Sequence, residues 1–134
     1  MRASCPAAAV VGVEPELAAD ARESLRRGER VSWPPADVQR TVADALRVER
    51  IGILPFAHIR EFVTDIITVT EDEMLAAVRL LATQARLIAE PGGAAAVAAC
   101  LSHRAELPEA EKPVAVLSGG NIDPVLLASI LATD

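Results

Sequence analysis

The sequence predicts an α/β fold in which a mostly parallel sheet of about three strands is flanked by helices in a partial three-layer sandwich. Short β-branched apolar runs alternate along the chain with longer segments that repeat apolar residues at helical spacing. Apolar residues make up 51% of the chain but aromatic residues only 2%, which favours alanine-rich helices on a sheet over an all-β sandwich. The length of 134 residues suits one domain, so we treat residues 1–134 as a single domain.

The first strand is expected at residues 10–13, where apolar residues precede Glu14 and Pro15. A helix over about residues 16–27 follows, because apolar residues recur there at helical spacing and Gly28 provides a stop. These elements form the first strand–helix unit of the predicted sheet.

The next region is expected to be helical but less regular. Residues 33–35 read Trp-Pro-Pro and predict an irregular connection, and residues 41–48 predict a short helix. Residues 55–63 predict another helix, because a proline suits a first helical turn.

The second strand is expected at residues 65–70, directly before a strong helix-start signal. Thr70 and Glu73 match a capping box, in which the threonine hydroxyl and the glutamate carboxylate each accept an amide hydrogen bond. The helix is expected to end near Ala89, because Pro91 follows. Its apolar stripe has a period near 3.6 residues and consists of Met74, Val78, Leu81, Ala85 and Ile88.

The remaining chain predicts one helix, one strand and a last helix. Residues 93–103 are rich in small side chains and should form a closely packed helix, and residues 114–117 form the third predicted strand. Asp123 and Pro124 begin the last helix as N-cap and first helical residue. Parallel sheets are normally buried on both faces and need more strands than three, so the sequence predicts part of a larger domain.

Charge and hydropathy exclude several classes of protein. The net charge of −6 argues against a nucleic-acid-binding protein, because neutralising phosphates needs a basic face. No apolar run reaches the roughly 20 residues that span a bilayer, so no membrane partner is expected. The opening from Met1 and Arg2 to Val11 weakly resembles a signal peptide, but it continues directly into a strand and its exit turn, so we do not expect secretion.

Neither the cysteines nor the histidines form a recognisable metal-binding or catalytic pattern. Cys5 and Cys100 lack metal-ligand spacing, which favours a reducing cytoplasm. His58 and His103 have no serine or cysteine partner at a telling spacing, and a favourable position on a helix dipole accounts for His103.

The segment Ser118-Gly119-Gly120-Asn121 is the first candidate for a ligand contact. It ends an apolar strand and precedes a helix start, at the sheet edge where α/β proteins bind ligands. A phosphate held by free amides is one interpretation, and a plain strand-to-helix turn that uses glycine for its freedom is the other. Local spacing leaves both open.

Acidic residues before prolines are the second candidate. Glu14 and Glu90 each end an element just before a proline, where a residue either faces a cleft or lies on the surface beside a helix breaker. Glu14, Glu16 and Asp20 are close enough in sequence to hold a hard cation through oxygen ligands. A favourable interaction with the helix dipole explains these acids equally well.

Five segments, taken together in order, resemble a known family. The chain from about Val10 to Asp123 is similar to the carboxyl-terminal half of threonine dehydratases and serine racemases, among the fold type II pyridoxal-phosphate enzymes. The segments that carry the resemblance are Val11-Gly12-Val13-Glu14-Pro15-Glu16, Thr41-Val42-Ala43-Asp44, residues 65–73 (DIITVTEDE), Glu90-Pro91-Gly92-Gly93-Ala94 and Leu117-Ser118-Gly119-Gly120-Asn121.

The resemblance implies roles for the cofactor-side residues. Ser118 would form a hydrogen bond with the pyridine nitrogen of pyridoxal 5′-phosphate, leaving the ring largely unprotonated and suited to β-elimination. Gly119 and Gly120 would let the ring lie against the backbone, and Glu90 would lie near the cofactor. The resemblance further implies a divalent cation, Mg²⁺ or Ca²⁺, held by the Glu14 carboxylate, the Ala18 carbonyl oxygen and the Asp20 carboxylate.

Three departures from the family pattern determine the activity that we expect. Family members bind the cofactor through a lysine in a motif resembling SFKxRG and hold its phosphate with a glycine-rich loop, and neither motif is present in these residues. The one lysine, Lys112, lies on a polar connection at the opposite end of the predicted third strand from Ser118. Ala45 also replaces a glycine common after the Thr41–Asp44 segment, which would narrow the substrate side.

The expected function is therefore part of a lyase. The parent enzyme would remove water from serine or threonine and release ammonia and a 2-oxo acid, and would form a homo-oligomer in the cytoplasm. This chain would be the later part of its large domain, from a truncated gene or a misassigned start, and inactive alone. The alternative is a non-catalytic binding or oligomerisation module, or a subunit that complements a separately encoded amino-terminal half.

Overall fold

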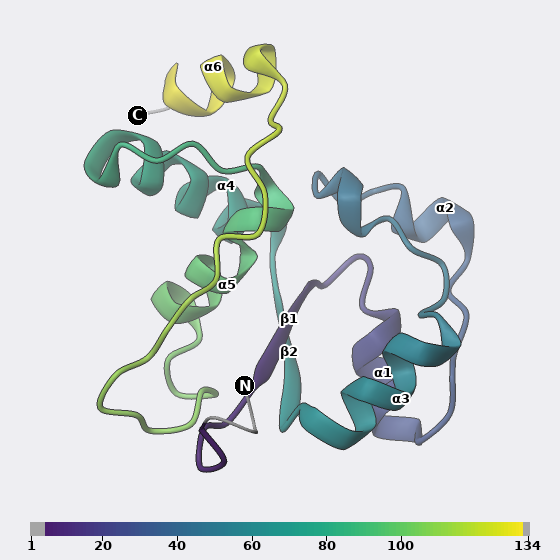
Figure 1. The fold of residues 1–134 in the computed structure, drawn as a ribbon. Coiled ribbons are helices and arrows are strands. Elements are labelled where there is room, and N and C mark those ends of the chain that lie inside the picture. Colours follow the sequence, from purple (N-terminus) through teal and green to yellow (C-terminus); the bar gives the residue numbers. More distant parts are fainter. Residues whose placement is uncertain (1–4, 133–134) are drawn as a thin grey trace.

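A computed structural model describes residues 5–132 and confirms the α/β class (Figure 1). Met1 and Arg2, the positive start of the opening segment, lie outside the described residues. Two strands pair in parallel, β1 (Val11–Pro15) and β2 (Asp65–Val69). The register places Val11 opposite Asp65 and Glu14 opposite Thr68. Parallel pairing needs a long crossover, and the chain between the strands supplies it.

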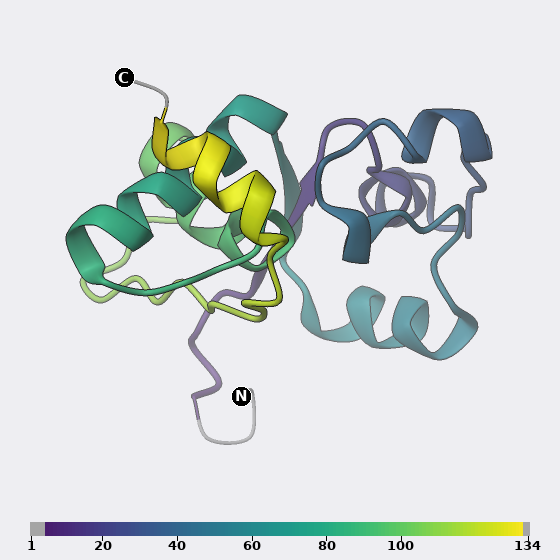
Figure 2. The same cartoon turned by 90° about the horizontal axis from the view of Figure 1, so that it is seen from above.

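The crossover covers one face of the sheet. It contains α1 (Asp20–Arg27), the short helix α2 (Pro35–Val38), the 3₁₀ turn η1 (Asp44–Leu46) and α3 (Ile53–Phe62). Figure 2 shows α1, α2 and α3 grouped on one side of the strands, away from the later helices.

The later helices lie on the other side of the strands (Figures 1 and 2), where α5 contacts both strands and α6 packs on α4. They comprise α4 (Glu71–Leu80), continued by the π-helical turn η2 (Leu81–Ala85), then α5 (Pro91–Ser102) and α6 (Pro124–Ala132). None of the helices within residues 5–132 combines the length and apolar character that crossing a membrane requires.

The alternation of side chains along β2 divides the core into two clusters. Ile66 packs with Phe56 of α3 and with residues of α1. Ile67 and Val69 point the other way and pack with Met74 and the alanines of α5. Strand side chains alternate between faces, so β2 is buried on both sides by helices, as the sequence predicts for a parallel strand.

The third predicted strand does not form in the described part of the chain. Residues 114–117 are extended beside α5 in Figure 1, but they pair with neither strand, so the sheet within residues 5–132 has two strands. Val114 and Val116 are 83% and 60% exposed. A strand is defined by its neighbour, and this apolar segment lies next to no strand of the described chain.

Two predicted helices in the crossover differ from those in the structure. In both segments a side-chain carboxylate accepts a backbone amide hydrogen bond. The helix predicted from residue 16 begins at Asp20, because the Glu14 side chain accepts the amides of Ala21 and Arg22. The helix predicted over residues 41–48 is only a 3₁₀ turn, because the Thr41 carbonyl oxygen accepts from the Arg47 guanidinium and the Ala45 amide donates to the Asp44 carboxylate, so the two do not form the first α-helical hydrogen bond.

The long helix after β2 also ends earlier than expected. Helix α4 stops at Leu80 and continues as the π-helical turn to Ala85, after which Arg86 adopts a left-handed φ of 59°. Ala85 and Ile88, placed on the apolar stripe by their spacing, are exposed. The predicted starts of α4 and α6 are confirmed. The capping box at Thr70 is present, and the Asp123 carboxylate caps α6 by accepting the Val125 amide at 2.6 Å.

Candidate functional site

The amino end of α5 and the turn at residues 118–121 are joined by two hydrogen bonds. The Glu90 amide donates to the Gly119 carbonyl oxygen at 3.1 Å, and the Asn121 amide donates to the Glu90 carboxylate at 2.9 Å. The structure thus brings together Glu90, Gly119 and Gly120, three of the residues that the family resemblance assigns to the cofactor. Ser118 is exposed at the start of this turn.

The glycines of this turn are required by packing within the chain. A Cβ atom on Gly93 would overlap the Gly119 carbonyl oxygen and lie 2.7 Å from the Gly119 nitrogen, closer than real contacts allow. A Cβ on Gly119 would lie 2.6 Å from the Glu90 carboxylate, and one on Gly120 would lie 2.8 Å from the Ile88 carbonyl oxygen. The absence of side chains therefore lets the turn lie directly on the α5 end, whatever else approaches it.

A third segment borders the same end of α5. Leu46 and Ala43 pack around Gly92, where an added Cβ would lie 3.4 Å from the Leu46 Cγ atom. Ala45 is exposed in the turn between them, and its amide donates to the Asp44 carboxylate at 2.8 Å. Residues 43–46, which include the Ala45 that the family resemblance places on the substrate side, therefore lie next to the 90–93 segment.

Glu71 holds that third segment, a role that the sequence did not reveal. Its carboxylate accepts the Val42 amide at 2.6 Å and the Thr41 hydroxyl at 3.1 Å, while its other oxygen is buried without a partner among residues 5–132. Thr41 is 30 residues away in sequence, so no local spacing could have paired the two.

Lys112 lies apart from this site. It is exposed on the connection of residues 103–113, which leaves the opposite end of α5 from Glu90 (Figure 1). A helix of this length separates its ends by about 18 Å. The geometry agrees with the expectation that Lys112 is remote from Ser118.

The acidic cluster lies between β1 and α1, on the opposite face of the sheet from α5. Glu14 accepts the amides of Ala21 and Arg22 at 3.1 and 2.7 Å and so caps α1 from outside. Burial raises the pKa of Glu14 to about 7, against the lowering effect of these hydrogen bonds, and the nearby Asp20 carboxylate adds to the rise. Burial also raises the pKa of Asp20, which is 3% exposed.

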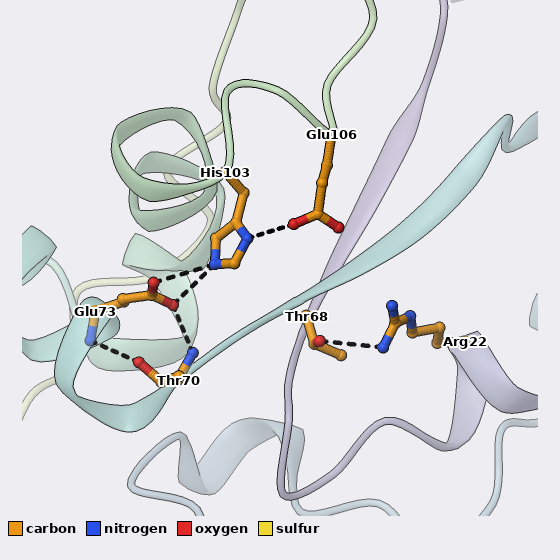
Figure 3. A network of polar contacts seen from close by, with 6 residues as sticks. All are labelled: Arg22, Thr68, Thr70, Glu73, His103 and Glu106. Carbon is orange, nitrogen blue, oxygen red and sulfur yellow. Dashed lines mark hydrogen bonds and ion pairs between the residues drawn. The ribbon is translucent and has the colours of Figure 1, made fainter.

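The acidic cluster has a carboxylate oxygen that is free to bind a cation. The Asp20 Oδ2 atom is buried and has no hydrogen-bond partner within the described chain. The Arg22 guanidinium donates to the Thr68 hydroxyl at 3.1 Å (Figure 3), and its positive charge acts on Glu14 by lowering the pKa of that carboxyl. Ala18 is 1% exposed in the same turn. Within residues 5–132, no group of three acidic, histidine or cysteine side chains is placed so that it could hold a metal ion, so a cation here needs backbone oxygen as well.

Comparisons with known proteins identify the family. The family model described as "Pyridoxal-phosphate dependent enzyme" matches residues 1–119. Threonine ammonia-lyase of Geobacter sulfurreducens is 37% identical over 123 residues, covering 92% of this chain and 30% of that protein. Human serine racemase is 36% identical over 127 residues, covering 92% and 36%.

The likeness extends to solved structures. A threonine deaminase from T.th. is 42% identical and superposes with a TM-score of 0.83, covering 91% of this chain and 40% of that one. Serine racemase from Dictyostelium discoideum is 32% identical with a TM-score of 0.75, covering 91% and 38%. The chain therefore spans between 30% and 40% of the length of these relatives.

Proposed function

The chain belongs to the pyridoxal-phosphate-dependent enzyme family, and we propose that it forms part of the cofactor domain of a lyase that eliminates water and ammonia from serine or threonine. The relatives that support this substrate class include threonine ammonia-lyases and serine racemases. Because the chain spans about a third of those proteins, it supplies one side of a site whose other side comes from sequence outside these 134 residues.

The observation that carries the proposal is the packing of the 118–121 turn on Glu90. Pyridoxal phosphate, when bound, withdraws electrons from the α-carbon of an amino acid, which is the chemistry that such an elimination needs. The turn leaves the Ser118 hydroxyl exposed beside a glycine pair that is fixed against the α5 end. A hydroxyl in that position fits a neutral ring nitrogen, because it donates one hydrogen bond and carries no charge.

In this proposal the main role of Glu90 is to hold the turn of residues 118–121 in place. Its carboxylate accepts the Asn121 amide, and its own amide donates to Gly119, so it fixes the backbone on both sides of the glycine pair. The cation proposed for Glu14, Asp20 and the Ala18 carbonyl oxygen fits the unpartnered Asp20 Oδ2 atom. A bound Mg²⁺ or Ca²⁺ would hold the β1–α1 turn through these oxygens and would not touch the Ser118 side of the sheet.

We further propose that the chain alone is inactive, because the site needs a lysine and a phosphate cradle that these residues do not provide. Lys112 is exposed and remote from Ser118. The missing part would lie in a longer chain or in a separate complementing subunit, and the assembled enzyme would be a homo-oligomer. Cys5 and Cys100 are both free thiols, which supports a reducing cytoplasm.

The test is a chimera in which this chain replaces the matching region of the Geobacter sulfurreducens threonine ammonia-lyase. We expect the chimera to release ammonia from threonine or serine when loaded with pyridoxal phosphate, and the isolated chain to release none. A Ser118→Ala variant should lower kcat in the chimera by at least about tenfold, the equivalent of one lost hydrogen bond of about 1.4 kcal/mol in the transition state.

A matched serine keeps this test interpretable. Ser102 is exposed at the end of α5, so Ser102→Ala should leave kcat unchanged. Equal activity in the two serine variants would refute the role of Ser118. Turnover by the isolated chain would refute the view that it holds only part of the site, and a folded chimera without activity in any variant would favour a non-catalytic module.

A further inference from the structure

His103 joins the carboxyl end of α5 to two carboxylates from different elements. The Nδ1 atom lies 2.7 Å from the Glu106 carboxylate, and the Nε2 atom lies 3.1 Å from both oxygens of Glu73 on α4 (Figure 3). The His103 amide donates to the Ala99 carbonyl oxygen, so the imidazole is attached where α5 ends. Both ring nitrogens therefore face acceptors.

Glu73 also starts α4. Its carboxylate accepts the Thr70 amide at 2.8 Å, and its own amide donates to the Thr70 hydroxyl at 3.2 Å. The same side chain thus caps the helix that follows β2 and holds the imidazole at the end of α5. Glu106, by contrast, is 52% exposed at its side chain and has His103 as its one side-chain partner in the described chain.

The number of carboxylates to which His103 can donate depends on the protonation state of its ring. A neutral imidazole has one N–H and one lone pair, so it can donate to one carboxylate only, and its other nitrogen would face a second carboxylate with lone pair against lone pair. The doubly protonated ring donates to both. We propose that His103 is a proton-operated latch, in which the imidazolium holds Glu73 and Glu106 together and the neutral ring releases Glu106.

Release at Glu106 would free the connection between α5 and the 118–121 turn. The Glu106 amide donates to the His103 carbonyl oxygen at 2.9 Å, so the two residues form the first turn of this connection. Residues 104–113 then border an open hollow of about 650 Å³, and Leu107 is the one residue of this segment that packs against the core in the described chain. The latch therefore ties down a segment that has few other attachments, and its opening leaves the two-helix core of α4 and α5 intact.

The charges around the ring favour the closed latch at neutral pH. The hydrogen bonds that the ring donates to Glu106 and to Glu73 raise the pKa of His103 above its usual value, and burial opposes this rise. The charged groups that act on the ring are these two carboxylates, from the connection and from α4; the neutral Thr70, which is the N-cap of α4, is bound to Glu73. The latch stabilises the fold fully below the ordinary histidine pKa and is lost as pH rises through the raised pKa.

The experiment is an NMR titration of the full chain between pH 5 and 9, with hydrogen exchange of the residue 104–111 amides measured at each pH. The chain has two histidines, so His103 is assigned by the signal that remains in a His58→Gln variant. After correction for base catalysis, we expect exchange at residues 104–111 to become several-fold faster across the His103 titration, while exchange in the middle of α5 stays constant.

Glu106→Gln tests the contact, and Glu109→Gln is its control, because it removes the same charge from the same exposed connection without touching the ring. The Glu106 variant should lower the His103 pKa more than the control does and make exchange at residues 104–111 fast at all pH values. Equal shifts in the two variants, or exchange at residues 104–111 that ignores the His103 titration, would overturn the proposal.

Discussion

Adjacent glycines at the start of α5 offer a sharp test of how the candidate site is built. Gly92 and Gly93 both have ordinary negative φ angles, since the one glycine with positive φ among residues 5–132 is Gly28. An alanine is therefore compatible with the backbone at either position, and replacing glycine in a helix gains up to about 1 kcal/mol. The two positions differ in what the new methyl group meets.

At Gly93 the methyl group would lie 2.7 Å from the Gly119 nitrogen and closer still to the Gly119 carbonyl oxygen, so the turn must move away by about 1 Å to reach normal contact. That movement breaks the 3.1 Å hydrogen bond from the Glu90 amide. Overpacking costs about 1–3 kcal/mol and the lost hydrogen bond about 0.5–1.5 kcal/mol. At Gly92 the methyl group meets the flexible Leu46 side chain at 3.4 Å, an ordinary contact.

We therefore expect Gly93→Ala to be less stable than Gly92→Ala by about 2–4 kcal/mol, because the helix-propensity gain is common to both. Urea unfolding followed by circular dichroism measures the difference. Hydrogen exchange of the Asn121 amide, which the Glu90 carboxylate accepts at 2.9 Å, reports whether the turn has detached. Equal stability together with a protected Asn121 amide in both variants would refute the packing of the turn on α5.

Three further predictions concern the core, the α4 start and the acidic cluster. Met74 is fully buried, so Met74→Ala should destabilise the chain to urea by about 2–5 kcal/mol and Met74→Leu by under about 1.5 kcal/mol. Thr70→Ala should cost about 1 kcal/mol and Thr70→Ser much less. Burial raises the pKa of Glu73, but hydrogen bonds from Thr70 and His103 outweigh burial and lower this pKa overall. Glu73 therefore contributes to the stability of the fold above the ordinary carboxyl pKa, and this contribution is lost as pH falls through the lowered pKa. Asp20→Asn should weaken Ca²⁺ binding at least about tenfold by calorimetry, and unchanged affinity would exclude Asp20 as a ligand.

Signals that lie within a few residues were sufficient to predict much of this fold. The capping box at Thr70 and the Asp123 cap both involve partners within three residues, and both are present. The parallel pairing of β1 with β2 follows from two apolar β-branched runs separated by a crossover of suitable length. Such features depend on local backbone chemistry, which the sequence displays directly.

The errors come from contacts between distant residues. Glu14 caps a helix that starts six residues later, and Glu71 on α4 binds the amide of Val42 ahead of the 3₁₀ turn. A carboxylate has no strong preference for one distant amide over another, so spacing alone cannot reveal these pairs. The third strand failed for a related reason, because residues 114–117 have a strand pattern but no described neighbour.

Residues 119 and 120 could be glycines for two different reasons, and the sequence does not distinguish them. Family resemblance assigns it to the cofactor, whereas the structure shows Gly119 packed on Glu90 and Gly120 on the Ile88 carbonyl oxygen. A glycine variant would therefore disrupt the turn and any ligand contact together, and its loss of activity would not distinguish them. Ser118 is exposed and lies outside that packing, so its hydroxyl can be removed without moving the turn. Comparing Ser118→Ala with Gly93→Ala thus separates recognition of the ring from construction of the turn that presents it.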